Sequence, residues 1–301
     1  MFIMTEKKAE LLMIFIILLR STSFVFSRLG LNSLGMFNIL ALRYLIAFFL
    51  VSAVVPGFRK KVTLRTVKKS AAVSVVYFLV MTCEMLSIRS IGASATCFLE
   101  NMSIVIVPFM TAFLLRRLPT AFSVAGSMIA LSGVAMISLR DGLSGLNTGI
   151  VWSFLAAFLY AVYITMNAKI CDEHDGLEIG ILLNGFLGVF GLTASFLFES
   201  PRLPSTSLEW ISILGLGILC SALGLTLQPV AQSYMPAYRA GILNAITPVS
   251  AAIQNYLILG ESLGMTGMAG SALIMVSVLL PKICSLPAFS GARRLIPLPK
   301  S

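Results

Sequence analysis

Four charged side chains interrupt the long apolar segments of this sequence, and they are its first candidates for chemistry. Arg20, Arg43, Glu84 and Glu100 each lie within such a segment or near its end. A charged side chain costs about 2.5–3.5 kcal/mol at the centre of a membrane-spanning helix. These side chains are therefore expected to face a wet cavity or a partner of opposite charge.

The two arginines are candidates for binding an anionic solute. A guanidinium group can hold a carboxylate or a phosphate through two parallel hydrogen bonds. Arg20 follows nine consecutive apolar residues, so a cavity would have to receive its side chain. The alternative for Arg20 is a structural ion pair with Glu84 or Glu100. Arg43 is a weaker candidate for substrate contact, because a purely structural role explains it as well.

Glu100 is the candidate for the ionisable centre of a site. It lies eight residues into an apolar segment, where a carboxylate would bind an amine or a cation, or take up a proton. We therefore assign it both a substrate-binding and a coupling role. The alternative is a structural pair with one of the arginines. Glu84 lies near the end of its segment, and reaching the membrane interface is the simpler interpretation for it.

Polar residues later in the chain could complete the same site. Asn244 and Asn255 share one helical face with Thr247, because the spacings of three and eleven residues return to the same side of a helix. Tyr163 lies three residues after Tyr160, so both rings and hydroxyls could line a cavity. The alternatives are hydrogen bonds between helices for the amides and ordinary packing for the rings.

The composition identifies the elements that must position these residues. Of the 301 residues 58% are hydrophobic and 11% are charged, and the mean hydropathy is +0.96. Soluble domains carry about 25% charged residues, so a soluble enzyme is excluded. A spanning helix needs about 20 apolar residues, and the sequence predicts an all-α polytopic membrane protein. Ten spans are expected, at 11–29, 35–55, 70–88, 93–115, 121–139, 148–168, 178–198, 209–228, 239–259 and 265–283.

The net charge of +10 reflects orientation in the membrane. With a cytoplasmic N-terminus, sixteen of the 22 lysines and arginines fall on the inner side and three on the outer side. Cytoplasmic loops carry such an excess, so the sequence predicts an integral multi-pass protein of the cell membrane with both termini in the cytoplasm. A nucleic-acid partner is not expected.

Residues for cofactor or catalytic chemistry are sparse. The five cysteines never occur in a CxxC spacing, and the single histidine, His174, lies in a loop. No metal site, cofactor or catalytic residue is predicted. The glycine-rich stretches lack the GK[ST] ending of a phosphate-binding loop.

A faint internal repeat organises the spans. A shift of 144 residues aligns 90–136 with 234–280 without a gap, although only eight of 47 pairs are identical, and it pairs Glu100 with Asn244. Five spans per half is an odd number, so the second half enters the membrane inverted. We predict a first repeat over 10–139, a second over 147–283 and a cytoplasmic tail over 284–301. Inverted repeats are typical of secondary transporters, whose site lies at the midplane between the halves.

Two stretches resemble a known family. "LLRSTSFVFSRLGLNSLGMFNILALRYLIAFF" resembles the opening of an EamA-type domain of the drug/metabolite transporter superfamily. "NAITPVSAAIQNYLILGESLGMTGMAGSALIMVSVLL" resembles its closing helices, with the Thr-Pro step at Thr247-Pro248 and the Leu-Gly-Glu step at Leu259-Gly260-Glu261. The resemblance implies ten helices in two inverted five-helix repeats, a central cavity, and movement of small polar metabolites or drugs. Many members resemble exporters of amino acids or related compounds.

The sequence departs from the family pattern at two points. Arg20-Ser21 stands where the family often has Trp-Gly, and Arg117 is the first-half counterpart of Glu261. Arg43 matches an arginine that the family has in its second helix. The first departure bears on the substrate, whereas the second leaves the fold unaffected.

The leading hypothesis is a secondary transporter that exports a small polar metabolite by alternating access. The alternatives are a membrane-embedded enzyme and a non-transporting receptor or scaffold, and an enzyme is not predicted. The lipid bilayer and a small-molecule substrate are the expected partners, and a homodimer is left open. A polar chamber between the two halves would favour transport, whereas a solid apolar core would exclude it.

Overall fold

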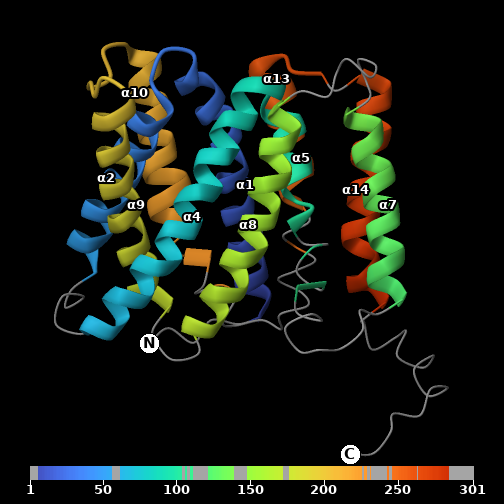
Figure 1. Cartoon of the computed structure of the whole chain (residues 1–301), viewed down its shortest axis with the longest axis horizontal. Helices are drawn as coiled ribbons and strands as arrows, with labels where there is room; N and C mark the ends of the chain where they lie inside the picture. The colour runs from blue at the N-terminus through green and yellow to red at the C-terminus, as the bar shows by residue number, and fades with distance from the viewer. Residues whose placement is uncertain are drawn as a thin grey trace, which may run out of the picture.

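Helices form the described part of the chain, in the order that the apolar segments predict (Figure 1). The computed structural model contains no β-strand among the residues it describes. Those residues are 6–55, 62–103, 106, 109–110, 121–138, 148–171, 176–225, 227–228, 231, 243, 246–262 and 264–284.

Each of the ten predicted spans contains a described helical segment. The first half comprises α1 (Glu6–Leu31), α2 (Met36–Val54), α4 (Leu64–Ile91), α5 (Ala93–Glu100) and α7 (Ala121–Ser138). The second half comprises α8 (Thr148–Cys171), α9 (Gly176–Phe198), α10 (Ser207–Leu214) continued by the π-helix η2 (Gly215–Leu225), α13 (Ile246–Leu259) and α14 (Gly264–Cys284).

The helices are long and apolar enough to make this an integral membrane protein. Within the described residues, six are long and apolar enough to cross a bilayer: α1, α2, α4, α8, α9 and the continuous α10–η2 helix. Large apolar side chains such as Phe196, Leu197 and Met265 are exposed on the outside of the bundle. A lipid-facing surface has this character, because a helix satisfies its backbone internally and needs no water. The total of ten crossings stays a prediction.

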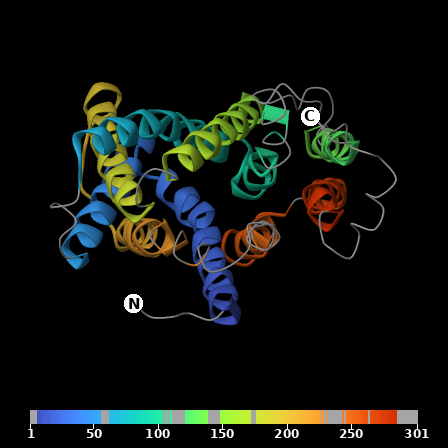
Figure 2. The same ribbon diagram turned by 90° about the horizontal axis from the view of Figure 1, so that it is seen from below.

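The helices pair across the two halves in a two-fold pattern. α2 packs on α9, and α7 packs on α14. The two members of each pair hold the same position in their respective halves. α1 packs on η2 and α13, and in the same way α8 packs on α4 and α5. Figures 1 and 2 place the α7–α14 pair at one edge of the molecule and α2 with α9 at the opposite edge. This pairing is what two repeats related by an inverted two-fold axis produce.

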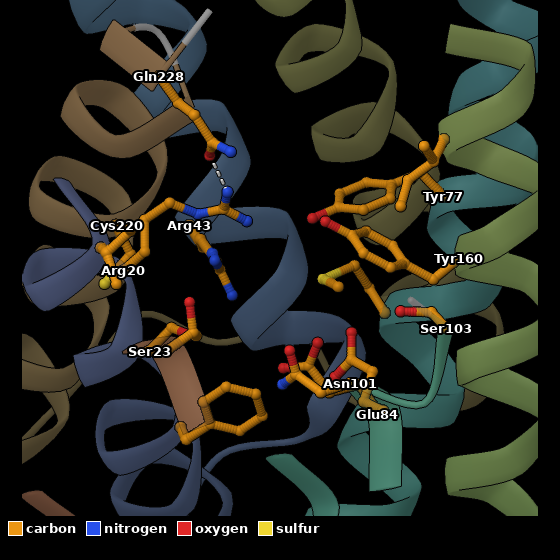
Figure 3. Close-up of a pocket in the computed structure, with 16 residues that line it drawn as sticks. Arg20, Ser23, Arg43, Tyr77, Glu84, Asn101, Ser103, Tyr160, Cys220 and Gln228 are labelled. Carbon is orange, nitrogen blue, oxygen red and sulfur yellow. Dashed lines mark hydrogen bonds between the residues drawn. The ribbon is translucent and has the colours of Figure 1, made fainter. Parts of the chain in front are cut away.

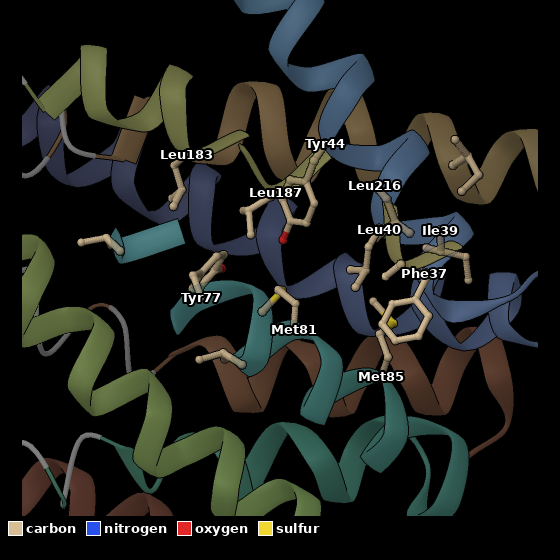
Figure 4. Close-up of a cluster of buried hydrophobic side chains, with 14 of the residues drawn as sticks. Phe37, Ile39, Leu40, Tyr44, Tyr77, Met81, Met85, Leu183, Leu187 and Leu216 are labelled. Atoms are coloured by element: carbon tan, nitrogen blue, oxygen red, sulfur yellow. The ribbon is translucent and has the colours of Figure 1, made fainter. Parts of the chain in front are cut away.

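A dense apolar cluster holds α2, α4 and α9 together (Figure 4). Tyr44 and Leu40 of α2, Met85 of α4 and Leu187 of α9 are all fully buried in it. Small residues bring the backbones close, since a Cβ at Gly191 would lie only 2.7 Å from the backbone nitrogen of Ala41. Such close packing stabilises helix pairs in lipid, where apolar burial alone provides no driving force.

Carboxylates of the second half cap helices of the first half at one end of the bundle. Glu199 accepts hydrogen bonds from the backbone N–H groups of Phe37 (3.2 Å) and Asn38 (3.0 Å), at the start of α2. Glu261 accepts from those of Ala93 (3.0 Å) and Ser94 (3.1 Å), at the start of α5. The first N–H groups of a helix lack partners within it, so an anion there is favourable.

An ion pair strengthens the same end. The Nε atom of Arg28, on α1, lies 3.5 Å from Oε1 of Glu261, and Nη1 of Arg28 donates to the carbonyl oxygen of Ile88 (3.0 Å). We call this end, with Arg28, Glu199 and Glu261, the capped end. α1 begins and α14 ends at the opposite end of the bundle (Figure 1).

Candidate functional site

A polar cavity of about 160 Å³ lies where the two halves meet. First-half helices α1, α2, α4 and α5 line it together with α8 and η2 of the second half, and Gln228 and Thr247 also contribute. By volume it would hold roughly five water molecules, at about 30 Å³ each. The core between the halves is therefore hollow and polar, as a transporter requires.

Two guanidinium groups occupy one side of this cavity (Figure 3). Arg20 of α1 donates a hydrogen bond to the side-chain oxygen of Gln228. The Nε atom of Arg43, on α2, donates to the hydroxyl of Ser221 at 2.7 Å. Arg43 is 5% exposed, and its Nη1 atom has no hydrogen-bond partner among the described residues. This nitrogen is therefore buried at the chamber wall without a partner among the described residues.

Two carboxyl groups occupy another part of the wall. Glu84 of α4 and Glu100 of α5 are 4% and 9% exposed, and their side chains interact directly. The Oε2 atom of Glu100 has no hydrogen-bond partner among the described residues. The interface interpretation of Glu84 is wrong, because α4 continues to Ile91 and leaves Glu84 about two turns inside the helix.

The opposite charges of the cavity do not pair with each other. Among the described residues, no ion pair within 4.0 Å joins Arg20 or Arg43 to Glu84 or Glu100, and the pairs that join Arg28 to Glu261 and Arg202 to Glu209 lie outside the cavity. Arg20 and Glu100 still attract each other across the chamber without direct contact. Cationic and anionic groups face the same chamber separately.

Tyrosines form a third part of the wall. Tyr77 of α4 and Tyr160 of α8 point their hydroxyl groups into the cavity (Figure 3). Tyr163 packs against both, with ring centroids 4.4 Å from Tyr77 and 5.6 Å from Tyr160. It is not among the residues that line the chamber. Tyr163 thus supports the wall from behind.

Of the two predicted asparagines, the structure describes Asn255, which does not line the cavity. Asn255 on α13 is fully buried, and its amide atoms have no hydrogen-bond partner among the described residues. It does not line the chamber, although Thr247 of the same predicted face does. Asn244 lies outside the described residues, as does most of the predicted tail 284–301.

Several polar contributors escaped the sequence reasoning, and three of them bear on the charged groups or the tyrosine wall. Tyr77 lies seven residues before Glu84, on the same face of α4, so the helical period could have found it. Gln228 is a polar residue at the end of an apolar span, which is a weak signal. Ser221 gave no signal, because a serine in a small-residue stretch is common in membrane helices.

No metal centre is formed by the described residues. They contain no cluster of three or more histidine, cysteine, aspartate or glutamate side chains that could hold an ion. The loop with His174 lies outside the described residues.

Comparison with known proteins identifies relatives for both halves. The sequence model of the EamA-like transporter family matches residues 7–139 and again 147–281. The uncharacterized transporter YcxC of Bacillus subtilis is 25% identical over 276 residues, which cover 85% of this chain and 86% of that protein. An uncharacterized transporter of Archaeoglobus fulgidus is 29% identical over 135 residues, 45% of this chain. That alignment spans about half of the archaeal protein (48%).

Shorter and structural matches agree with this. Solute carrier family 35 member F5 of Macaca fascicularis is 38% identical over 68 residues, which are 22% of this chain and 16% of the carrier. One crystal structure superposes with a TM-score of 0.65 at 17% identity, covering 97% of this chain and 99% of its own. At that identity the match establishes a shared fold.

Proposed function

The chain belongs to the EamA-like transporter family, and from this premise we propose that it exports a small zwitterionic metabolite, such as an amino acid or a related compound. It is an integral membrane protein, and its named relatives are transporters. The proposal adds the substrate class, the direction and the mechanism of transport. We assign the two repeats to 10–139 and 147–283, with the solute bound between them.

The separation of charge within the cavity is the observation that carries this proposal. A guanidinium pair on α1 and α2 can receive a carboxylate, since arginine holds such a group through two hydrogen bonds. The carboxyl pair of Glu84 and Glu100 can receive an ammonium group. The chamber of about 160 Å³ suits a solute of amino-acid size. A solute with one charge would leave the other pair unsatisfied.

Glu100 is the group that we assign to coupling. Two carboxyl groups in contact repel each other when both are ionised, so a proton on one of them relieves the repulsion. An incoming ammonium group would compete with that proton for the same oxygens. Proton release and solute binding at Glu100 would then be linked.

The capped end supports alternating access. Glu199 and Glu261 belong to the second half, and both bind the N-termini of first-half helices there. Opening this end would require these contacts to break as the halves rock apart. In the orientation favoured by the basic residues, the capped end faces outward.

A flux assay on the purified protein in proteoliposomes tests the substrate class. Vesicles loaded with unlabelled solute would be offered radiolabelled L-alanine or L-leucine, together with the single-charge analogues propionate and ethylamine. We expect counterflow of at least one amino acid and none of either analogue. Counterflow of ethylamine or propionate at the rate of the amino acid would overturn the zwitterion assignment.

A further inference from the structure

The two cavity arginines of the first half both contact one short stretch of the second half. The π-helix η2 supplies Ser221 and Gly224, and Gln228 follows three residues after its end, at spacings of three and four residues along the chain. We call these three residues the guanidinium seat. π-helical turns are rare and occur frequently at functional sites, because they change which side chains face inward.

Ser221 determines which edge of Arg43 faces the chamber. Its hydroxyl accepts from the Nε atom at 2.7 Å, and both residues are buried. With Nε satisfied, the buried Nη1 atom is left without a partner among the described residues, and a ligand that binds there would have to move the surrounding side chains slightly. A carboxylate could then approach the outer edge of the guanidinium, the geometry of two parallel hydrogen bonds.

Gly224 makes room for Arg20. A Cβ at Gly224 would lie 2.6 Å from the Cγ atom of Arg20 and 3.1 Å from its Cδ atom. Cγ is close to the backbone of α1, so it cannot move aside without redirecting the whole side chain. At the end of the same side chain, the guanidinium group of Arg20 donates a hydrogen bond to Gln228. Glycine at 224 and glutamine at 228 together define the direction of Arg20.

We propose that the guanidinium seat positions Arg20 and Arg43 for the anionic group of the substrate, and that it thereby sets the preference for carboxylate-bearing solutes. The inference rests on the proposed function for its substrate class. Ser221, Gly224 and Gln228 are positioning residues, because they act through the arginines. The seat and the arginines belong to different repeats, so the anion-binding geometry depends on how the halves sit against each other.

Transport kinetics provide the first test, with L-leucine as the probe in proteoliposomes. We expect Ser221→Ala and Gln228→Leu each to raise KM about tenfold, the effect of losing one hydrogen bond to a charged group, with Vmax within about twofold. Ser221→Thr keeps the hydroxyl and should keep the KM of the wild type. Ser212→Ala, in α10 and away from the cavity, is the matched control. Equal KM values for Ser221→Ala and Ser212→Ala would overturn the proposal.

The glycine has its own control. Gly224→Ala should raise KM, whereas Gly180→Ala on α9 should not, because the nearest atom to a Cβ there is 4.0 Å away. A KM for Gly224→Ala that equals that of Gly180→Ala would contradict the seat. Size-exclusion profiles confirm that each variant is folded, and the serine variants decide the matter where Gly224→Ala does not fold.

A chemical readout separates this inference from the substrate assignment. Phenylglyoxal modifies arginine side chains, and mass spectrometry gives the rate at Arg20 and Arg43 individually in detergent-solubilised protein. Releasing a guanidinium should speed its modification at least threefold, at Arg20 in Gln228→Leu and at Arg43 in Ser221→Ala. Unchanged rates would refute the seat even where L-leucine is transported. Changed rates without any amino-acid transport would refute the proposed function and retain the seat.

Discussion

At the scale of single residues, the decisive feature is that charges of both signs face one chamber without forming a direct ion pair among the described residues. Arg43 retains a free Nη1 atom and Glu100 a free Oε2 atom, as far as the described residues show. Buried charged atoms without partners are expensive in a membrane, so a chain that keeps them needs them for a ligand, a proton or water. The free atoms therefore mark the two ends of the site.

Glu100 should control the pH dependence of transport. Glu100→Gln keeps the shape of the side chain but removes its ability to release a proton. We expect the variant to bind solute weakly and to lose the response of L-leucine flux to an imposed pH gradient. Glu178→Gln, on α9 outside the cavity, is the control. The coupling role fails if Glu100→Gln transports with the pH profile of the wild type.

Binding of the substrate carboxylate should require the planar guanidinium group of Arg20. Arg20→Lys preserves the charge but offers a point ammonium instead of two parallel donors. We expect the KM for L-leucine to rise at least tenfold, and the inhibition of transport by ethylamine, which lacks a carboxylate, to stay unchanged. Competition assays in proteoliposomes measure both. A KM within twofold of the wild type would show that Arg20 does not contact the carboxylate.

At the scale of elements, apolar periodicity predicted where helices lie but not how they deviate from regularity. The span expected at 209–228 is an α-helix that continues as a π-helix from Gly215, and the span expected from residue 93 has a first helix that ends at Glu100. Both irregularities border the cavity. Hydropathy averages over a window, so it cannot register a local change of helical winding.

The site was partly predictable for the same reason. Arg20, Arg43 and Glu100 stood out because charge is rare in apolar segments. The partners that fix them, such as Ser221 and Gln228, depend on which helices cross, and one sequence does not contain that information. Asn255 was predicted from the helical face that it shares with Thr247. Thr247 lines the chamber, whereas Asn255 is buried and does not line it.

The cap on α5 should contribute measurably to stability. Glu261→Gln removes the negative charge at the helix N-terminus and the ion pair with Arg28. We expect a loss of about 1 kcal/mol, the usual contribution of an anion at this position, seen as a lower unfolding temperature in detergent. A decrease no larger than that of Glu178→Gln would show that the cap contributes nothing.

At the scale of the whole molecule, two repeats enclose a site that neither could form alone. Helices of the first half bring the charges, and η2 with α8 of the second half supplies the groups that hold or face them. The capped end ties the halves together on one side of that site. Rocking about the chamber is the motion that such an arrangement permits.

The orientation in the membrane can be tested directly. The excess of lysine and arginine predicts that both termini lie in the cytoplasm and the capped end outside. A cysteine at Ser205, which is exposed near the capped end, should react with an impermeant maleimide added to intact cells. A fluorescent protein fused after Ser301 should fluoresce in the cytoplasm. Labelling of residue 205 only after cell lysis would show that the protein has the opposite orientation in the membrane.

The claim that solute passes through the cavity is tested most directly by blocking it. Ser23 lines the chamber without holding a charge, so Ser23→Cys in a variant without native cysteines offers a single reactive thiol there. Modification of this thiol by methanethiosulfonate ethylsulfonate should abolish L-leucine counterflow, and saturating L-leucine should slow the modification. Complete modification that leaves counterflow intact would contradict the account.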